Sequence, residues 1–276
     1  VTGLIGPNGS GKTTLMLMLG SLLQPDAGSI RIAGHDPVTE TAAVRSRLGW
    51  MPDVLGSWST ISVRDTLIYT ARMYAMDKTT AAGRAAELIA LVDLGELADS
   101  PTRVLSRGQK QRLSLARALV HDPSVLLLDE PASGLDPVAR AHLRTLVRRL
   151  ASEGKTLLVS SHVLSELDEM ADGAVYLSKG VTASAEALAR SRATARPWRI
   201  RSSDAVALRA ALVAEGIEEA AIATDRTELI VALEGEAAAS ALLARLVAAG
   251  VAISTFAPAV GDLEHAFIDL STEDNK

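Results

Sequence analysis

Short apolar runs alternate with amphipathic segments over the first 180 residues of the chain. Val125–Leu128 and Thr156–Ser160 are apolar or β-branched runs that end in polar residues, as expected of parallel strands buried on both faces. Between them, Ala139–Leu150 has apolar residues at helical spacing. Strands that alternate with helices in this way predict a doubly wound α/β core.

The same patterns predict the remaining elements of this core. We expect strands at Leu4–Ile5, Ser29–Gly34, Leu48–Pro52 and Ala174–Leu177, and helices at Leu15–Leu19, Thr41–Arg47, Ser62–Tyr74, Thr80–Val92, Gly108–Val120 and Leu164–Met170. The helices between about residues 54 and 118 follow one another without a strand, so they predict a helical subdomain.

A change of pattern after residue 180 predicts a second, smaller domain, and we place the two domains at residues 1–190 and 191–276. The segment from Val181 to Arg196 predicts a helix followed by a linker. Beyond it, the order strand, helix, strand, strand, helix, strand is that of a ferredoxin-like α+β unit. The expected elements are Trp198–Arg201, Asp204–Glu215, Ile217–Thr224, Glu228–Leu233, Glu236–Ala249 and Val251–Phe256, followed by an amphipathic helix through Leu263, Ala266, Phe267 and Leu270.

Composition narrows the function classes. The chain has 276 residues and a net charge of −5, which gives no electrostatic reason to expect nucleic acid binding. It has no cysteine, which excludes disulfides and thiolate chemistry. Its apolar runs are far shorter than the about 18 residues that a membrane-spanning helix needs. No signal peptide precedes Gly6, where the first sequence motif begins, so we expect a cytosolic protein. Because Val1 lies only five residues before Gly6, we also expect that N-terminal strands of the core are missing.

The segment from Gly6 to Thr13 fits the phosphate-loop pattern G-x-x-x-x-G-K-[ST], between an expected strand and an expected helix. Its glycines let successive backbone N–H groups point inward at a phosphate, and the helix that follows adds the positive end of its dipole. Lys12 supplies a charge for the β- and γ-phosphates of a nucleotide, and Thr13 can ligate Mg²⁺. The candidate phosphate-binding residues are Gly6, Pro7, Asn8, Gly9, Ser10, Gly11, Lys12, Thr13 and Thr14.

Asp129 and Glu130 end the apolar run that begins at Val125, and His162 follows the next predicted strand of the core. Two acids at such a position are often a solvated strand end. Here a phosphate loop lies upstream, and the ends of parallel strands converge on one ligand crevice. An aspartate there can hold Mg²⁺, and an adjacent carboxylate can polarise the water that attacks the γ-phosphate.

These motifs together resemble those of the ATP-binding subunits of ABC transporters. Residues 105–109 read L-S-R-G-Q, which is similar to the family signature L-S-G-G-Q, and they precede a predicted helix. Residues 131–136 resemble the segment that follows the Walker B strand in the family, including the D-loop, and His162 matches the family's switch histidine. The motifs follow one another in family order over about residues 1–180.

The resemblance implies a P-loop NTPase fold of ABC type and a role for each motif. Asp129 would hold Mg²⁺ with Thr13, Glu130 would orient the hydrolytic water, and His162 would contact the γ-phosphate of ATP. Two subunits would meet head to tail as a homodimer or heterodimer. Ser106 and Gly108 would then bind the ATP of the partner subunit, so that ATP joins the two subunits.

Three departures from the family pattern bear on this resemblance. Asp53 stands where family members usually carry a glutamine, and a carboxylate there could contact Mg²⁺ directly. Arg107 replaces the first glycine of the signature. The aromatic residue that stacks on adenine in the family lies upstream of the phosphate loop, and this chain has none there.

The second domain resembles the extra domain of ABC-2-type export ATPases, and residues 262–267 resemble an ending common there, although a structural cap or dimer contact would explain them as well. We therefore expect an ATPase that drives export through a separate membrane-spanning permease, on the inner face of the cell membrane. The alternative is a soluble ABC ATPase that acts on a cytosolic assembly. An interaction protein that binds ATP without hydrolysing it would not need Glu130 and His162.

Overall fold

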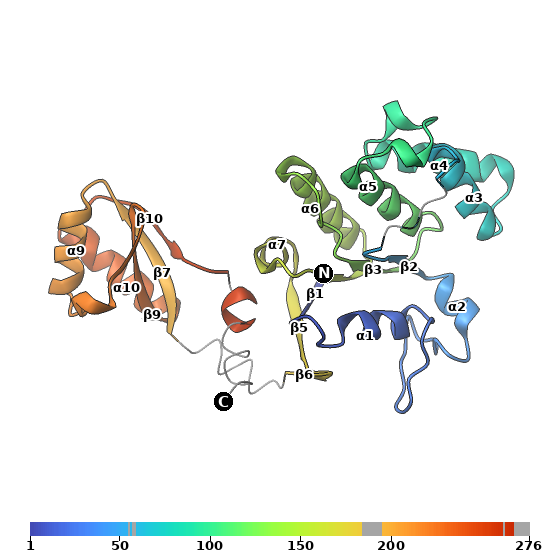
Figure 1. Cartoon of the computed structure of the whole chain (residues 1–276). Helices are drawn as coiled ribbons and strands as arrows, with labels where there is room; N and C mark the ends of the chain where they lie inside the picture. The colour runs from blue at the N-terminus through green and yellow to red at the C-terminus, as the bar shows by residue number, and fades with distance from the viewer. Residues whose placement is uncertain (55, 57–58, 184–194, 262, 268–276) are drawn as a thin grey trace. The chain divides into compact units, whose positions relative to one another are not determined.

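A six-stranded sheet forms the centre of the first of two compact units, Val1–Thr182 (Figure 1). The computed structural model describes residues 1–54, 56, 59–183, 195–261 and 263–267. The strand order is β2-β3-β4-β1-β5-β6, with β1 to β5 parallel and β6 antiparallel to β5. The strands are β1 Thr2–Ile5, β2 Leu48–Met51, β3 Val125–Asp129, β4 Thr156–Ser160, β5 Gly173–Ser178 and β6 Val181–Thr182.

Helices cover both faces of this sheet, as a doubly wound core requires (Figure 1). On one face lie α1 (Lys12–Leu19) and α2 (Thr41–Arg45), and on the other α5 (Arg107–Ala118) and α6 (Pro137–Ser152). Because the central strands are covered on both sides, their side chains are buried nearly throughout. In β3, Leu126, Leu127 and Leu128 are at most 2% exposed.

The helical subdomain expected between residues 54 and 118 contains α3 (Val63–Met73), α4 (Lys78–Leu91) and α5. The Ser62 side chain caps α3 by accepting a hydrogen bond from the Asp65 N–H, and the Asp77 side chain caps α4. Such caps satisfy backbone donors that the first turn of a helix leaves free. The sequence therefore determines locally where these helices begin.

Two expected elements of the first unit differ in the structure. The strand expected at Ser29–Gly34 is absent from these described residues, where an isolated bridge joins Ile32 to His35. Ala33 and Gly34, with φ of 49° and 85°, turn the chain too tightly for a longer strand to pair. The helix expected from Leu15 already begins at Lys12, directly after the phosphate loop.

The second unit, Ala183–Lys276, contains a four-stranded antiparallel sheet of order β10-β7-β9-β8. Its elements are β7 Ala195–Ser202, α9 Ala205–Ala214, β8 Ala223–Asp225, β9 Glu228–Glu234, α10 Gly235–Ala248 and β10 Ile253–Pro258. Numbered within the unit, this order is 4-1-3-2, that of a ferredoxin-like fold. The unit begins at Ala183, whereas the sequence pattern placed the boundary after residue 190.

The core of the second unit joins the sheet to its two helices. Its buried members include Trp198, Ile200, Leu208, Leu212, Leu229, Val231, Leu242 and Leu246. The strand expected at Ile217–Thr224 was too long, because its first half forms the 3₁₀ turn Glu219–Ala221. Of the helix and linker expected at Val181–Arg196, residues 184–194 lie outside the described residues, as does Leu270 of the last helix.

Three further elements of the first unit are α7 at Leu164–Met170 and two short 3₁₀ turns at Gly95–Leu97 and Thr102–Val104. In the second unit, residues 263–267 are helical, where the sequence predicts the start of the last helix. Within the described ranges, every helix falls short of the length and apolar character that a membrane-spanning segment needs.

The contact between α5 and β2 depends on Gly49, and a substitution there tests the packing of the first unit. A Cβ at this position would lie 2.2 Å from the Ala118 carbonyl oxygen and 2.8 Å from Leu126 Cδ2. We expect Gly49→Ala to lower the free energy of unfolding by about 1–3 kcal/mol, because the helix must move off the strand. Urea unfolding of the full chain measures this change.

Gly83→Ala in α4 is the matched control, because a Cβ there meets nothing within 4 Å. That variant should gain about 0.5–1 kcal/mol from the better helix propensity of alanine. Equal stability of the two variants would contradict the close packing of α5 on β2.

Candidate active site

The phosphate loop lies between the end of β1 and the first turn of α1, and its glycines are required by its shape. A Cβ on Gly6 would lie 2.2 Å from the Leu177 carbonyl oxygen and 2.5 Å from Ser10 Oγ. Gly9 and Gly11 have φ of 81° and 104°, in the left-handed region that other residues rarely adopt. The loop therefore curls tightly at the N-terminus of α1, where free backbone N–H groups favour an anion.

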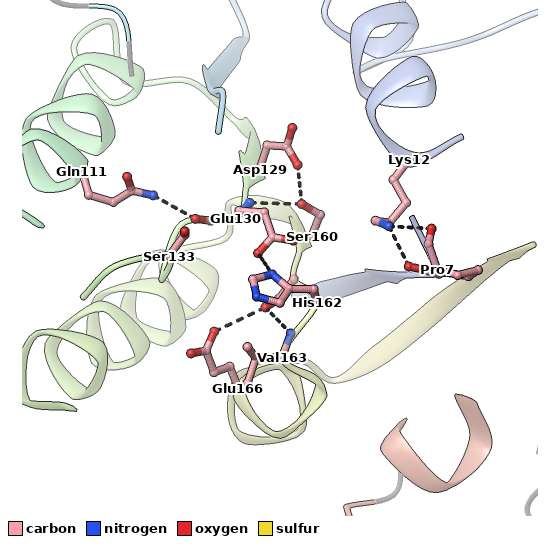
Figure 2. Close-up of polar contacts among 12 residues, drawn as sticks. Pro7, Lys12, Gln111, Asp129, Glu130, Ser133, Ser160, His162, Val163 and Glu166 are labelled. Carbon is pink, nitrogen blue, oxygen red and sulfur yellow. Dashed lines mark hydrogen bonds and ion pairs between the residues drawn. The ribbon is translucent and has the colours of Figure 1, made fainter. Parts of the chain in front are cut away.

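Lys12 folds back over this loop, where its ammonium donates hydrogen bonds to the carbonyl oxygens of Gly6 at 2.6 Å and Pro7 at 3.1 Å (Figure 2). These weak acceptors can be exchanged for phosphate oxygens, which bind an ammonium more strongly. The Ser10 hydroxyl is 2% exposed and has no hydrogen-bond partner among the described residues. The loop thus has both the shape and the free donors that suit a phosphate chain.

A cavity of about 500 Å³ opens beside the loop and brings the predicted residues together. It is lined by Asn8, Gly9, Gly11, Lys12, Thr13, Thr14, Leu17, Trp50, Pro52, Asp53, Val54, Asp129 and Glu130. Asp53, predicted as a metal ligand only through the family resemblance, lies in this cavity with Asp129. The predicted site residues that are not among its lining residues are Gly6, Pro7, Ser10, Ser106, Gly108 and His162.

The residues present fit Mg²⁺ bound together with a nucleotide. Thr13 and Asp129 both line the cavity and offer oxygen ligands. The described residues contain no cluster of three or more His, Asp and Glu side chains that could hold a metal ion by themselves. Magnesium commonly binds to one or two protein oxygens and completes its shell with phosphate oxygens and water.

Asp129 is held at the end of β3 by the neighbouring strand β4. The parallel register places Asp129 opposite Ser160, whose hydroxyl donates a hydrogen bond to Asp129 Oδ1 (Figure 2). The Ser160 hydroxyl oxygen in turn accepts a hydrogen bond from the Glu130 N–H at 3.1 Å. Asp129 is 7% exposed, so this bond fixes its carboxylate where water has little access.

Glu130 has a backbone conformation that is rare outside glycine. Its φ is 50°. A residue other than glycine in this conformation commonly lowers the stability of the folded state by about 1–3 kcal/mol, and such residues cluster at functional sites. Its carbonyl oxygen accepts a hydrogen bond of 2.8 Å from Gln111 Nε2 on α5, and its N–H bonds to Ser160. Neither Ser160 nor Gln111 was predicted as part of the site.

The Glu130 side chain points toward His162, and Oε2 lies 2.7 Å from His162 Nδ1 (Figure 2). Burial raises the pKa of the Glu130 carboxyl, and the nearby carboxylates of Asp129 and Asp53 raise it further. The hydrogen bond and charge of His162 lower it, but the net shift is upward. A half-buried carboxylate with a raised pKa is a stronger base toward water than an exposed one.

The signature-like segment forms the start of α5. The Ser106 side chain caps the helix by accepting a hydrogen bond from the Gln109 N–H. In turn, the Gln109 side chain accepts a hydrogen bond from the Ser106 N–H, which completes a capping box. Ser106 and Arg107 are exposed. The Arg107 guanidinium donates to Ser133 Oγ at 2.9 Å, so it lies against the turn that follows Glu130.

Three residues of the site were missed by the sequence reading, each for a physical reason. Ser160 was read only as the end of a strand, although its place opposite Asp129 follows once β3 and β4 are paired. Gln111 lies one helical turn beyond Arg107, and nothing in the sequence marks its contact with Glu130. Trp50 was read as part of a strand, yet it also lines the cavity.

Comparison with known proteins shows similarity over part of the chain. Residues 1–133 match the family model described as ABC transporter. Over these residues the first unit is similar to ABC-type ATP-binding domains. Its fold agrees with this similarity, because an ATP-binding subunit of an ABC transporter superposes with a TM-score of 0.62 at 25% identity, over 68% of this chain and 80% of that one.

Similar proteins of known name extend this comparison. A daunorubicin resistance ATP-binding protein of Streptomyces coeruleorubidus is 41% identical over 172 residues, which are 62% of this chain and 54% of that protein. A Nod factor export ATP-binding protein I of Burkholderia orbicola is 39% identical over 178 residues, which are 64% of this chain and 59% of that protein. The chain thus spans less than two thirds of the length of each of these relatives.

The raised pKa of Glu130 makes a prediction about stability. Above the raised pKa the carboxylate is ionised in both states and opposes folding, because the folded protein desolvates it. Glu130→Gln should therefore unfold at a higher denaturant concentration than the wild type at pH 7–8. The difference should shrink as the pH falls through the raised pKa toward the ordinary value of 4.5, and vanish below it. A difference that does not change with pH would contradict this explanation.

Proposed function

We propose that this chain is the ATP-binding and hydrolysing subunit of an ABC transporter, and that it energises export through a separate membrane-spanning subunit. The observation that carries the proposal is the cavity in which the phosphate loop meets Asp129 and Glu130. The names of the two relatives, one for drug resistance and one for Nod factor export, support an exporter of ABC-2 type.

The phosphate loop would bind the nucleotide. Backbone N–H groups of residues 9–14 would donate to the phosphates, and Lys12 would exchange its two carbonyl acceptors for β- and γ-phosphate oxygens. Thr13 and Asp129 would hold Mg²⁺, with Asp53 as a further oxygen on the cavity wall. The metal, when bound, neutralises charge that develops on the phosphates.

Glu130 would act as the general base. Its carboxylate would accept a hydrogen bond from a water molecule in line with the γ-phosphate, and would take the proton as the water oxygen bonds to phosphorus and the bond to the β-phosphate breaks. His162 would hold the Glu130 side chain through the 2.7 Å contact and could reach the γ-phosphate with its other ring nitrogen.

The signature-like segment would serve the nucleotide of a second subunit. Ser106 is exposed, begins a helix of 12 residues and is not among the lining residues of the cavity in its own chain. A helix N-terminus with a hydroxyl and the Gly108 N–H suits a phosphate that another subunit presents. A solved ATP-binding cassette with bound ADP and phosphate is dimeric and shares this fold, at 23% identity and a TM-score of 0.61 over 66% of this chain.

The membrane-spanning subunit would dock on the helical subdomain near Asp53. Exposed apolar side chains gather along α3, where Met73 is 71%, Tyr69 49% and the adjoining Tyr74 39% exposed. Val54, next to Asp53, is 81% exposed. An apolar surface of this kind suits a partner helix, and it would hold the ATPase against the inner face of the cell membrane.

Removal of the Glu130 carboxylate separates binding from hydrolysis. Glu130→Gln should bind ATP as well as the wild type. It should hydrolyse ATP at least about 100-fold more slowly, since a general base contributes about 10²–10⁴-fold to the rate. The variant should also accumulate as an ATP-bound dimer in size-exclusion chromatography. Lys12→Ala is the contrasting control, because it should lose ATP binding itself. Near-normal turnover by Glu130→Gln would refute the role of Glu130.

Copurification from membranes tests the transporter itself. The tagged protein, isolated from gently solubilised membranes, should bring a polytopic membrane protein in a stoichiometric amount. Met73→Glu should weaken this association, because it places a charge on the exposed surface of α3. Leu22→Glu, at another exposed apolar position of the first unit, should not. A homodimer without a membrane partner would favour an ATPase that acts on a cytosolic assembly.

A further inference from the structure

The backbone of Glu130 is held on both sides by buried side chains from two different elements. Ser160, at the end of β4, is 0% exposed and accepts the Glu130 N–H. Gln111, on α5, is 2% exposed and donates to the Glu130 carbonyl oxygen. Figure 2 shows these two contacts on opposite sides of the Glu130 backbone, one at its N–H and one at its carbonyl oxygen.

We propose that Gln111 and Ser160 are positioning residues for hydrolysis, which hold Glu130 in its strained conformation so that its carboxylate meets the attacking water. Gln111 also makes the placement of Glu130 depend on the position of α5. The inference rests on the role of Glu130 as general base proposed above, and it deepens that role.

The strain makes the two contacts necessary. A glutamate at a φ of 50° relaxes toward the right-handed or extended region unless its surroundings hold it. Such a change would rotate the peptide and carry the side chain away from His162 and the cavity. Because both partners are buried, water does not compete for the two hydrogen bonds. Each bond therefore stabilises the Glu130 conformation more than it would at the surface.

The Ser160 hydroxyl joins the metal-binding acid to the base. It donates to Asp129 Oδ1 and accepts from the Glu130 N–H, so one oxygen sets the position of both residues. An alanine at position 160 would leave a buried carboxylate oxygen and a buried N–H each with one partner fewer. The relative placement of Asp129 and Glu130 would then depend on the strand pairing alone.

Gln111 joins Glu130 to the helix that begins at Ser106. Arg107, one turn earlier on α5, bonds Ser133 in the same turn of the chain, so α5 holds this turn at two points. A displacement of α5 is therefore transmitted to the Glu130 peptide. Binding of a nucleotide at the N-terminus of α5 would thereby affect the base that serves the other nucleotide of the dimer.

The test compares steady-state hydrolysis and ATP binding of the full chain and its variants. Gln111→Met keeps the length of the side chain and removes the donor, and Ser160→Ala removes the hydroxyl. Each should lower kcat about tenfold, equivalent to about 1.4 kcal/mol, with KM and ATP affinity changed less than about twofold. Ser160→Thr, which keeps a hydroxyl, should retain activity. Ser114→Ala, also buried on α5, should behave as the wild type.

A positioning role is distinguished from a merely structural one by combining the variants. In a Glu130→Gln background, Gln111→Met should cause no further loss of hydrolysis, because the base that it positions is already absent. A further tenfold loss in that background, or an unchanged kcat in the single variants, would overturn the inference. If Glu130→Gln alone hydrolyses ATP normally, the proposed function of Glu130 fails instead.

Discussion

Parallel pairing of β1, β4 and β3 is the constraint on which the site depends. Ser160 in β4 is paired with Leu4 in β1 on one side and with Asp129 in β3 on the other. The three strands therefore end at one level, and the segments that follow them meet at the same edge of the sheet. A slip of two residues in either pairing would keep every buried side chain on its proper face, yet it would separate the phosphate loop from the acids.

The charges at this edge explain why a metal belongs to the proposed chemistry. Asp53, Asp129 and Glu130 line the same cavity as the phosphate loop, and a nucleotide would bring further negative charge to it. Lys12 and the N-terminus of α1 are the positive groups on the loop side of the cavity. A divalent cation between the acids and the phosphates would offset their mutual repulsion, and it would leave Glu130 free to act on water.

The sequence predicted the parts of this arrangement that depend on local pattern. Glycine spacing, apolar runs and helix caps identified the phosphate loop, the buried strands and the helical subdomain, and the family comparison confirmed the fold class. The strand expected at Ser29–Gly34 was wrong because a tight turn overrode a short alternating pattern. Ser160 and Gln111 could not be recognised, because neither belongs to a motif and their contacts with Glu130 form only when β4 and α5 pack against the end of β3. Their importance depends on the backbone conformation of Glu130, and the identity of this residue does not predict that its φ is positive.

The arginine that interrupts the signature pattern is accommodated by the turn at Gly134. Arg107 does not extend over the N-terminus of α5, since its guanidinium bonds to Ser133 Oγ beside Gly134. Gly134 has a φ of 74°, and a Cβ there would lie 2.6 Å from Arg107 Cδ and Nε. The glycine at 134 thus provides both the turn and the space that the arginine fills. The N-terminus of α5, with Ser106 and the Gly108 N–H, stays accessible to a phosphate even though a bulky residue occupies the position of a glycine.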